Sequence, residues 1–315
     1  MRLLFLGTPA FAVPSLRALV DAGHEVALVV TRPDSPRGRG RRVEACAVKL
    51  DALALGLEVA QPASVNEAEF MEQLRGLKPE LGIVVAFGRL LSAELLAVPR
   101  HGFINVHGSL LPRWRGAAPI QRGLLAGDSE FGVTVQCVAE QMDAGDVLLA
   151  ESVIAEAGDN LGTLEARLEP LGAGLLVQAV AQFAGGEVRR VAQDEALVTF
   201  APAIKDTEAL IDWSQPAERI VRQVRAFNPR PVAWTSFSGG RLNVFEAAVA
   251  AAGGSEPGVI MAVTRQGPVV SAGEGAVTLR EIQAAGCKRM NGRDWANGVR
   301  LAVGSRFNEK AVTNR

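Results

Sequence analysis

The sequence predicts two domains: an α/β domain built on a parallel sheet covered by helices, followed by a small β-barrel domain. The chain has 315 residues, about twice the size of a typical domain. Apolar, strand-like runs alternate with helical patterns from Met1 to about Val188, and this alternation is typical of parallel sheets. After Asp206 the chain changes to short strand-like runs separated by glycine-rich turns, which favours a barrel.

The first half is expected to hold a series of buried strands with helices between them. The predicted strands are residues 2–6, 25–31, 57–60, 81–87 and 102–107, with further apolar runs at 133–138 and 147–154. Helices are expected after Pro14, over residues 68–74, and over residues 163–183, where Pro170 should kink or split the helix. The first strand ends in Gly7-Thr8-Pro9, without the GxGxxG pattern of a dinucleotide site. We therefore do not expect NAD binding, but ligands of such sheets still bind beyond the carboxyl ends of the strands.

The second half is expected to follow a linker. Residues 189–205 lack periodicity, so they are interpreted as a linker between a first domain (residues 1–188) and a second domain (residues 206–315). Ser214 is expected to cap a helix that runs to about Phe227. Strand-like runs follow at residues 232–237, 241–246, 258–263, 268–271 and 276–282, and residues 247–254 are interpreted as a loop.

The overall charge conceals an uneven distribution. Lys plus Arg is 33 and Asp plus Glu is 34, giving a net charge of −1, which argues against a nucleic-acid partner. Residues 1–204 alone carry −6, however, and residues 205–315 carry +5. Within the acidic half, the loop of residues 32–42 holds five arginines against the single acid Asp34. This loop is either a solvated segment or a phosphate-binding surface, because arginine binds phosphate well.

Composition also indicates the compartment. No apolar run approaches the roughly 18 residues of a membrane helix, so no membrane association is expected. The three cysteines are far apart and form neither a CxxC nor a zinc-like spacing. A reducing cytoplasm and the absence of a metal are the plain interpretation.

A polar pair lies at the end of one predicted strand. Asn105 and His107 alternate along residues 102–107, so their side chains share a face, at the sheet edge where ligands bind. For the pair alone, a satisfied strand end is the favoured interpretation. The other two histidines, His24 and His101, are placed in surface turns.

Two neighbouring segments could add to that pair. Arg113 and Arg115 flank Trp114 and form either a solvated patch or an anion site. Asp143 lies in a turn of Asp and Gly residues at 143–146, which is either a β-turn or a carboxylate that orients a nearby histidine. Sequence distance leaves both questions open.

Together these residues resemble a known family. The run Asn105 to Gln121, which reads NVHGSLLPRWRGAAPIQ, is similar to the signature of the tetrahydrofolate-dependent formyltransferases. The resemblance extends from the first strand to about Phe307 and includes LGTP at residues 6–9, RPD and GRG at 32–34 and 38–40, MDAGD at 142–146, IDW at 211–213 and RAFNP at 225–229. The central motif is specific to formyl transfer, and the GRG loop and second domain resemble the branch that acts on tRNA.

The resemblance implies a fold and a reaction. The fold is a Rossmann-like formyltransferase domain with a C-terminal OB-like barrel. The reaction moves the formyl group of 10-formyltetrahydrofolate to the amino group of methionyl initiator tRNA, without a metal, in a cytoplasmic monomer. The alternatives are a formyltransferase for a nucleotide-linked amino sugar or for glycinamide ribonucleotide, and an RNA-binding module without activity.

The resemblance also assigns residues. It implies that the catalytic residues are Asn105, His107 and Asp143; that folate is bound by Ser109, Leu110, Leu111 and Pro112, with Phe87 and Gly88 lining the pterin pocket; and that tRNA is bound by Arg37, Arg39, Arg41 and Arg42. Asn105 and a protonated His107 can donate hydrogen bonds to the oxyanion that develops during transfer. Asp143 is the plausible proton relay, directly or through His107 or a water.

Overall fold

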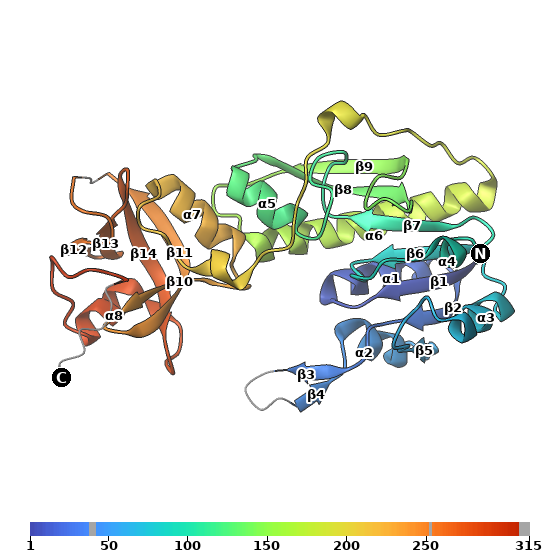
Figure 1. The fold of residues 1–315 in the computed structure, drawn as a ribbon, viewed down its shortest axis with the longest axis horizontal. Coiled ribbons are helices and arrows are strands. Elements are labelled where there is room, and N and C mark those ends of the chain that lie inside the picture. Colours follow the sequence, from blue (N-terminus) through green and yellow to red (C-terminus); the bar gives the residue numbers. More distant parts are fainter. Residues whose placement is uncertain (38–41, 252–253, 309–315) are drawn as a thin grey trace. The chain divides into compact units, whose positions relative to one another are not determined.

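The computed structural model describes residues 1–37, 42–251 and 254–308, which form two compact units (Figure 1). The first unit consists of Met1–Pro119, Glu130–Ile154 and Glu165–Pro202. The second unit consists of Ile120–Ser129, Ala155–Leu164 and the chain from Ala203 onward. Two short segments from the first half of the sequence therefore belong to the second unit. No helix in the described ranges is long and apolar enough to span a membrane.

The first unit is built on a seven-stranded sheet with the order β5-β2-β1-β6-β7-β8-β9. Its strands are β1 (Arg2–Gly7), β2 (Glu25–Val30), β5 (Val59–Ala60), β6 (Leu81–Val85), β7 (Phe103–His107), β8 (Glu130–Cys137) and β9 (Val147–Ile154). The first five pair in parallel, as the alternating pattern predicts. Strands β8 and β9 add on in antiparallel fashion, which the prediction of a parallel sheet did not distinguish.

Helices surround this sheet, and a short hairpin projects from it (Figure 1). The helices are α1 (Val13–Asp21), α2 (Ala47–Ala54), α3 (Ala68–Gly76), α4 (Ala93–Leu96) and α6 (Leu161–Gly185), with 3-10 turns at Ala10–Ala12 and Glu195–Leu197. The hairpin pairs β3 (Ser35–Arg37) with β4 (Arg42–Glu44). On α1, Leu16 and Leu19 are fully buried, as their spacing predicts.

Helix α6 is one continuous helix of 25 residues with Pro170 inside it, so of the two outcomes expected at Pro170, a kink or a split, the split does not occur. The middle of α6 packs closely on the sheet. A Cβ atom on Gly172 would lie 2.9 Å from Val106 on β7 and 3.2 Å from Val133 on β8. Burial of this apolar face against the sheet offsets the loss of one backbone hydrogen bond at the proline.

The second unit contains a six-stranded antiparallel sheet with the order β10-β11-β14-β13-β12, with β15 paired to β14. Its strands are β10 (Ala233–Phe237), β11 (Gly240–Ala250), β12 (Ile260–Thr264), β13 (Gly267–Ser271), β14 (Ala276–Ala284) and β15 (Met290–Asn291). Its helices are α5 (Pro119–Ala126), α7 (Ala217–Ala226) and α8 (Gly292–Gly298), with a 3-10 turn at Asp206–Ala209. Among the described residues no pairing joins β10 to β12, so the sheet is not closed into a barrel.

Two local predictions for this unit are wrong. Strand β11 continues to Ala250, where a loop from residue 247 was expected, because residues 247–250 pair with β14. Helix α7 begins after Pro216, without a side-chain cap. Ser214 instead donates its hydroxyl to Asp212 at 2.6 Å.

The core of the second unit is aromatic. Trp213, Phe237, Trp295 and Phe307 pack with ring centroids 5.4–6.2 Å apart. Trp213, Trp295 and Phe307 are all at most 5% exposed. These three rings therefore stabilise the fold and are not available to stack on nucleic-acid bases.

The two inserted segments are bound to this unit by hydrogen bonds. Arg122 on α5 forms a two-pronged ion pair with Glu208, with N–O distances of 2.7 and 3.0 Å. The amide of Gly162 donates to the carbonyl of Asn228 at 3.1 Å. The Arg225 side chain donates to the carbonyl of Asp159.

Candidate active site

Strand β7 brings Asn105 and His107 to one face of the first sheet. Asn105 pairs with Val84 on β6 and with Gln136 on β8. His107 is the last residue of the strand and lies opposite Thr134. Both therefore occupy the carboxyl edge of β7, where the alternation of strand residues predicts them.

Asp143 lies beside both of these side chains. It sits in the connection between β8 and β9, and one of its carboxylate oxygens, Oδ1, is 3.4 Å from Asn105 Nδ2 and 3.6 Å from His107 Nδ1. The His107 and Asp143 side chains are 6% and 14% exposed. The sequence left open whether Asp143 only forms a turn or also lies near a histidine, and in the structure it lies near His107.

Further donors hold the Asp143 carboxylate in place. Gln136 Nε2 donates to Oδ1 at 3.0 Å, and the backbone amide of Gly116 donates to Oδ2 at 2.9 Å. Gly116 has φ +128°, a conformation open essentially to glycine alone. A Cβ atom there would lie 2.6 Å from the Ala201 carbonyl oxygen. Glycine at this position therefore lets the amide reach the carboxylate.

The His107 ring is engaged on both sides. Its Nε2 lies 2.9 Å from the carbonyl oxygen of Trp114, and since a carbonyl only accepts, Nε2 is the donor. Nδ1 faces Asp143. To donate to a third group, the ring must give up one of these two contacts.

The turn after β7 is fastened to β8. Thr134, which is fully buried, donates its hydroxyl to the Ser109 carbonyl at 2.7 Å and accepts from the Leu111 amide at 3.1 Å. The Ser109 hydroxyl donates to the Arg113 carbonyl at 2.6 Å. Leu110 packs so closely on Gly132 that a Cβ atom there would be 2.4 Å from it. These contacts fix the turn of residues 109–113, in which Pro112 is half-buried.

Phe87 and Gly88 follow strand β6. Phe87 is 1% exposed and packs in the main core cluster with Leu4 and Leu6. Its side chain is thus committed to the core. Gly88 is exposed, with φ +71°, so it is the member of this pair that faces solvent.

Sequence reasoning missed several residues that support the site. Arg115, considered above as a possible anion site, is 1% exposed and forms an ion pair with Glu195 at 2.7 Å. Its Nε donates to Gln193 at 3.0 Å. Gln193 and Glu195 lie in the segment interpreted as a linker, where no periodic pattern marks them. Gln136 gave no signal either, because a single glutamine in an apolar strand is not distinctive.

One cysteine lies near the site, at the end of β8. Burial raises the pKa of the Cys137 thiol, which disfavours the nucleophilic thiolate. All three cysteines are free. Among the described residues, no group of three His, Cys, Asp or Glu side chains could hold a metal ion.

The arginine loop predicted to bind tRNA is only partly described. Arg37 and Arg42 are paired positions of the hairpin β3–β4, while Arg39 and Arg41 lie outside the described residues. The one acid of the loop, Asp34, binds Lys49 on α2 at 2.6 Å. This hydrogen bond holds the pKa of Asp34 below its ordinary value. Because Lys49 already neutralises Asp34, that acid does not offset the arginines.

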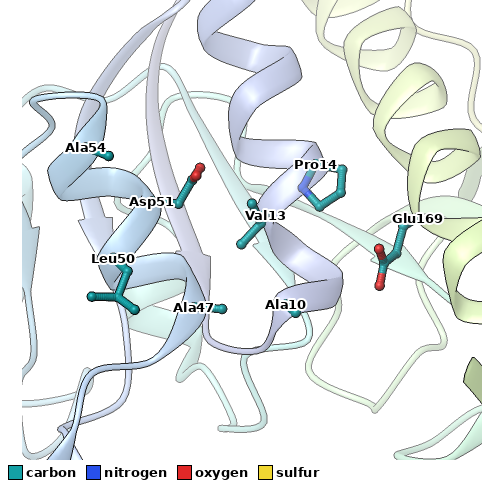
Figure 2. A pocket seen from close by; sticks show the side chains of 8 residues that line it. All are labelled: Ala10, Val13, Pro14, Ala47, Leu50, Asp51, Ala54 and Glu169. Atoms are coloured by element: carbon teal, nitrogen blue, oxygen red, sulfur yellow. The ribbon is translucent and has the colours of Figure 1, made fainter.

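A separate hollow of about 510 Å³ lies over helices α1 and α2 (Figure 2). It is mostly apolar and is lined by Ala10, Val13, Pro14, Ala47, Leu50, Asp51, Ala54 and Glu169. Figure 2 shows the Asp51 carboxylate pointing from α2 toward α1. Oδ1 of that carboxylate accepts from Arg17. No residue of the Asn105–His107–Asp143 group lines this hollow.

Known proteins resemble this chain along its whole length. Residues 1–180 match the formyl transferase family, and residues 203–300 match the formyl transferase C-terminal domain. A methionyl-tRNA formyltransferase of Moorella thermoacetica is 47% identical, covering 96% of this chain and 98% of that protein. The Bacillus subtilis protein of the same name is 42% identical and covers 96% of each.

Solved structures share the fold at low identity. HypX from Aquifex aeolicus in complex with tetrahydrofolic acid superposes with a TM-score of 0.64 at 18% identity, over 96% of this chain and 48% of that one. An N-formyltransferase from Helicobacter canadensis, in complex with folinic acid and dTDP-3-aminofucose, gives 0.64 at 15% identity, over 91% and 99%. The extent and identity of the sequence matches decide the assignment: this chain belongs to the formyl transferase family, in its methionyl-tRNA formyltransferase branch.

Proposed function

We propose that this chain formylates the amino group of methionyl initiator tRNA with 10-formyltetrahydrofolate, and that Asn105, His107 and Asp143 carry the chemistry. The observation that supports this most is the Asp143 carboxylate, which accepts hydrogen bonds from Asn105, Gln136 and the Gly116 amide and lies 3.6 Å from His107 Nδ1. Relatives at 42–47% identity carry the methionyl-tRNA name. The sugar enzyme is 15% identical, so the amino-sugar alternative has much weaker support.

Asn105 is suited to bind the oxygen of the formyl group. Formyl transfer to an amine passes through a tetrahedral centre with a negatively charged oxygen. Asn105 Nδ2 carries two hydrogens, and one of them points to Asp143 Oδ1 at 3.4 Å. That contact orients the amide and leaves the second hydrogen for the oxyanion. A preorganised donor of this kind is typically worth about 3–4 kcal/mol.

Asp143 is suited to accept the proton that the attacking nitrogen loses and to return it to the folate nitrogen when the bond from that nitrogen to the formyl carbon breaks. Its carboxylate is mostly buried, yet still 14% exposed, so a water or the substrate amine can reach it. His107 Nδ1 faces the same carboxylate oxygen, so a protonated His107 can stabilise the negative charge of Asp143. His107 serves as a second oxyanion donor only if its ring gives up the contact with the Trp114 carbonyl or the contact with Asp143.

The folate is proposed to bind at the turn of residues 109–112 and at Gly88. Both segments follow the carboxyl ends of neighbouring strands β7 and β6, where sheets of this kind bind ligands. The fastening of the turn to Thr134 would keep this surface rigid. Phe87 would contribute through its backbone, since its ring lies in the core.

The tRNA is proposed to contact the arginine loop and the basic second unit, whose sheet we propose to be OB-like. Residues 205–315 carry a net charge of +5, which favours a phosphate backbone. We further propose that the protein acts as a monomer in the cytoplasm, where translation supplies this tRNA. Along the sequence, we keep residues 1–188 and 206–315 as the proposed limits of the catalytic and tRNA-binding domains, while residues 120–129 and 155–164 pack with the second unit.

Alanine substitutions test this proposal. Asn105→Ala, His107→Ala and Asp143→Ala are each expected to lower formyl transfer to charged initiator tRNA by about 100-fold or more, with wild-type circular dichroism. Gln73→Ala, on the exposed face of α3, is the control and should keep full activity. Near wild-type turnover in all three variants would overturn the residue assignment. Formylation of an amino-sugar nucleotide in preference to charged tRNA would overturn the substrate.

A further inference from the structure

We propose that Gln193 and Arg115 are positioning residues, which fix the Asp143 turn and the direction in which the neighbouring amides donate. This inference rests on the proposed role of Asp143. Neither residue contacts the side chain of Asn105, His107 or Asp143 directly. Gln193 contacts the turn through backbone carbonyls, and Arg115 acts through Gln193.

The Gln193 side chain binds the turn that carries Asp143. Its Nε2 donates to the carbonyl oxygens of Asp143 at 2.8 Å and Gly145 at 2.7 Å. Asp143 itself has φ +52°, in the left-handed region that non-glycine residues rarely occupy. Such a conformation persists when its surroundings hold it. Gln193 supplies two of the contacts that do so.

A second branch from Gln193 reaches the carboxylate. Gln193 Nε2 also lies 3.2 Å from Gln136 Oε1. Because a donor faces Gln136 Oε1, the other end of that amide, Nε2, is turned toward Asp143 Oδ1 at 3.0 Å. Gln136 is 1% exposed, so water does not compete freely for its amide. The Gln193 donor and the acceptor-only Asp143 carboxylate thus both favour the orientation in which Gln136 donates to Asp143.

Arg115 determines the orientation of Gln193 in turn. A guanidinium has donors only, and Arg115 Nε lies 3.0 Å from Gln193 Oε1. The oxygen of Gln193 must therefore face Arg115, and its nitrogen must face the turn. Arg115 is held by Glu195 and by backbone hydrogen bonds to Thr199 and Ala201. Donor direction consequently passes from Arg115 through Gln193 and Gln136 to Asp143.

A purely structural role for this network would have different consequences. Loss of packing or of a tether would reduce the folded fraction or the melting temperature, and it would leave the rate per folded active site unchanged. A positioning role lowers kcat while substrate binding is retained. Its effect also disappears when the Asp143 carboxylate is already absent, because residues that act through one group are not additive.

The decisive variant is Gln193→Glu, because glutamate has nearly the same shape as glutamine. The Gln193 side chain is half-buried. A glutamate keeps the bond to Arg115 but offers oxygens to the two carbonyls and to Gln136. Gln136 then lies between two carboxylates, and in either orientation of its amide one of them faces the Gln136 oxygen without a hydrogen. We expect kcat for charged initiator tRNA to fall at least about tenfold, with KM for both substrates within about twofold. Gln73→Glu, the same chemical change on exposed α3, should leave both constants unchanged.

The double variant Gln193→Glu with Asp143→Asn completes the test. It should turn over no more slowly than Asp143→Asn alone in single-turnover reactions. Additive losses would overturn the positioning role, and so would a wild-type kcat in Gln193→Glu. If Asp143→Asn itself keeps wild-type turnover, the proposed function fails instead. Should Gln193→Glu not fold, Gln193→Ala replaces it with the same expected split between kcat and KM.

Discussion

Gly145 offers a direct way to displace the Asp143 turn. A Cβ atom at this position would lie 1.8 Å from the carbonyl oxygen of Cys137 and 2.8 Å from its carbon. Both atoms belong to the backbone of β8, which cannot rotate away as a side chain can. In Gly145→Ala the two segments must therefore separate by roughly 1.5 Å to reach an ordinary contact.

The consequences for Asp143 follow from its contacts. Its carboxylate oxygens lie 3.0 Å from Gln136 Nε2 and 2.9 Å from the Gly116 amide, and a shift of that size breaks both hydrogen bonds. A misplacement of about 1 Å at a catalytic group costs about 100-fold in rate. Overpacking of this kind also destabilises by about 1–3 kcal/mol. We therefore expect Gly145→Ala to lose about 100-fold in kcat and to melt several degrees lower.

Steady-state formylation of charged initiator tRNA and thermal unfolding measure the two effects. Gly174→Ala in α6 is the matched control, because Gly174 is exposed and has no atom within 4 Å of the added methyl group. That control should keep full activity and gain about 0.5–1 kcal/mol, since alanine favours a helix over glycine. A Gly145→Ala protein with turnover within about twofold of wild type would refute the reasoning.

Two further predictions concern charge. Arg122 holds the pKa of Glu208 below its ordinary value of 4.5 through a hydrogen bond, so the pair stabilises the fold above that pH and loses its effect as pH falls through the lowered pKa. In urea unfolding, Glu208→Gln should cost up to about 1 kcal/mol at pH 7, and the difference should shrink below about pH 4.5; an equal cost at every pH would exclude the ion pair as its source. The double variant Arg39→Ala with Arg41→Ala should bind initiator tRNA more weakly and with a salt dependence about two charges shallower, and unchanged binding at every salt concentration would exclude the loop as a phosphate contact.

The sequence was most informative where local geometry decides the structure. Asn105 and His107 share a face because strand residues alternate, so their side-by-side position follows from a pattern of only three residues. The direction of β8 and β9 was not accessible in this way, because an apolar run reads the same in parallel and antiparallel pairing. Pro170 does not divide α6, because packing of the helix on the sheet outweighs the local preference of proline.

The supporting contacts of the site were out of reach for a different reason. Gln193 and Gln136 are 57 residues apart, and neither belongs to a periodic or charged pattern. Only the fold brings residues 199–201 back to the loop of residues 115–118, as their backbone hydrogen bonds show. A segment without periodicity is therefore poor evidence for a mere linker.

The composition of the second unit bears on how the chain can be cut and recombined. Residues 120–129 and 155–164 belong to it together with the chain from residue 203, and Arg122 and Gly162 bind partners there. A fragment that begins at residue 206 would leave Glu208 without its arginine and the Asn228 carbonyl without its donor. The unit is discontinuous in the gene, so a domain swap that moves only the C-terminal coding region transfers an incomplete module. An intact transplant has to carry three separate segments of the reading frame.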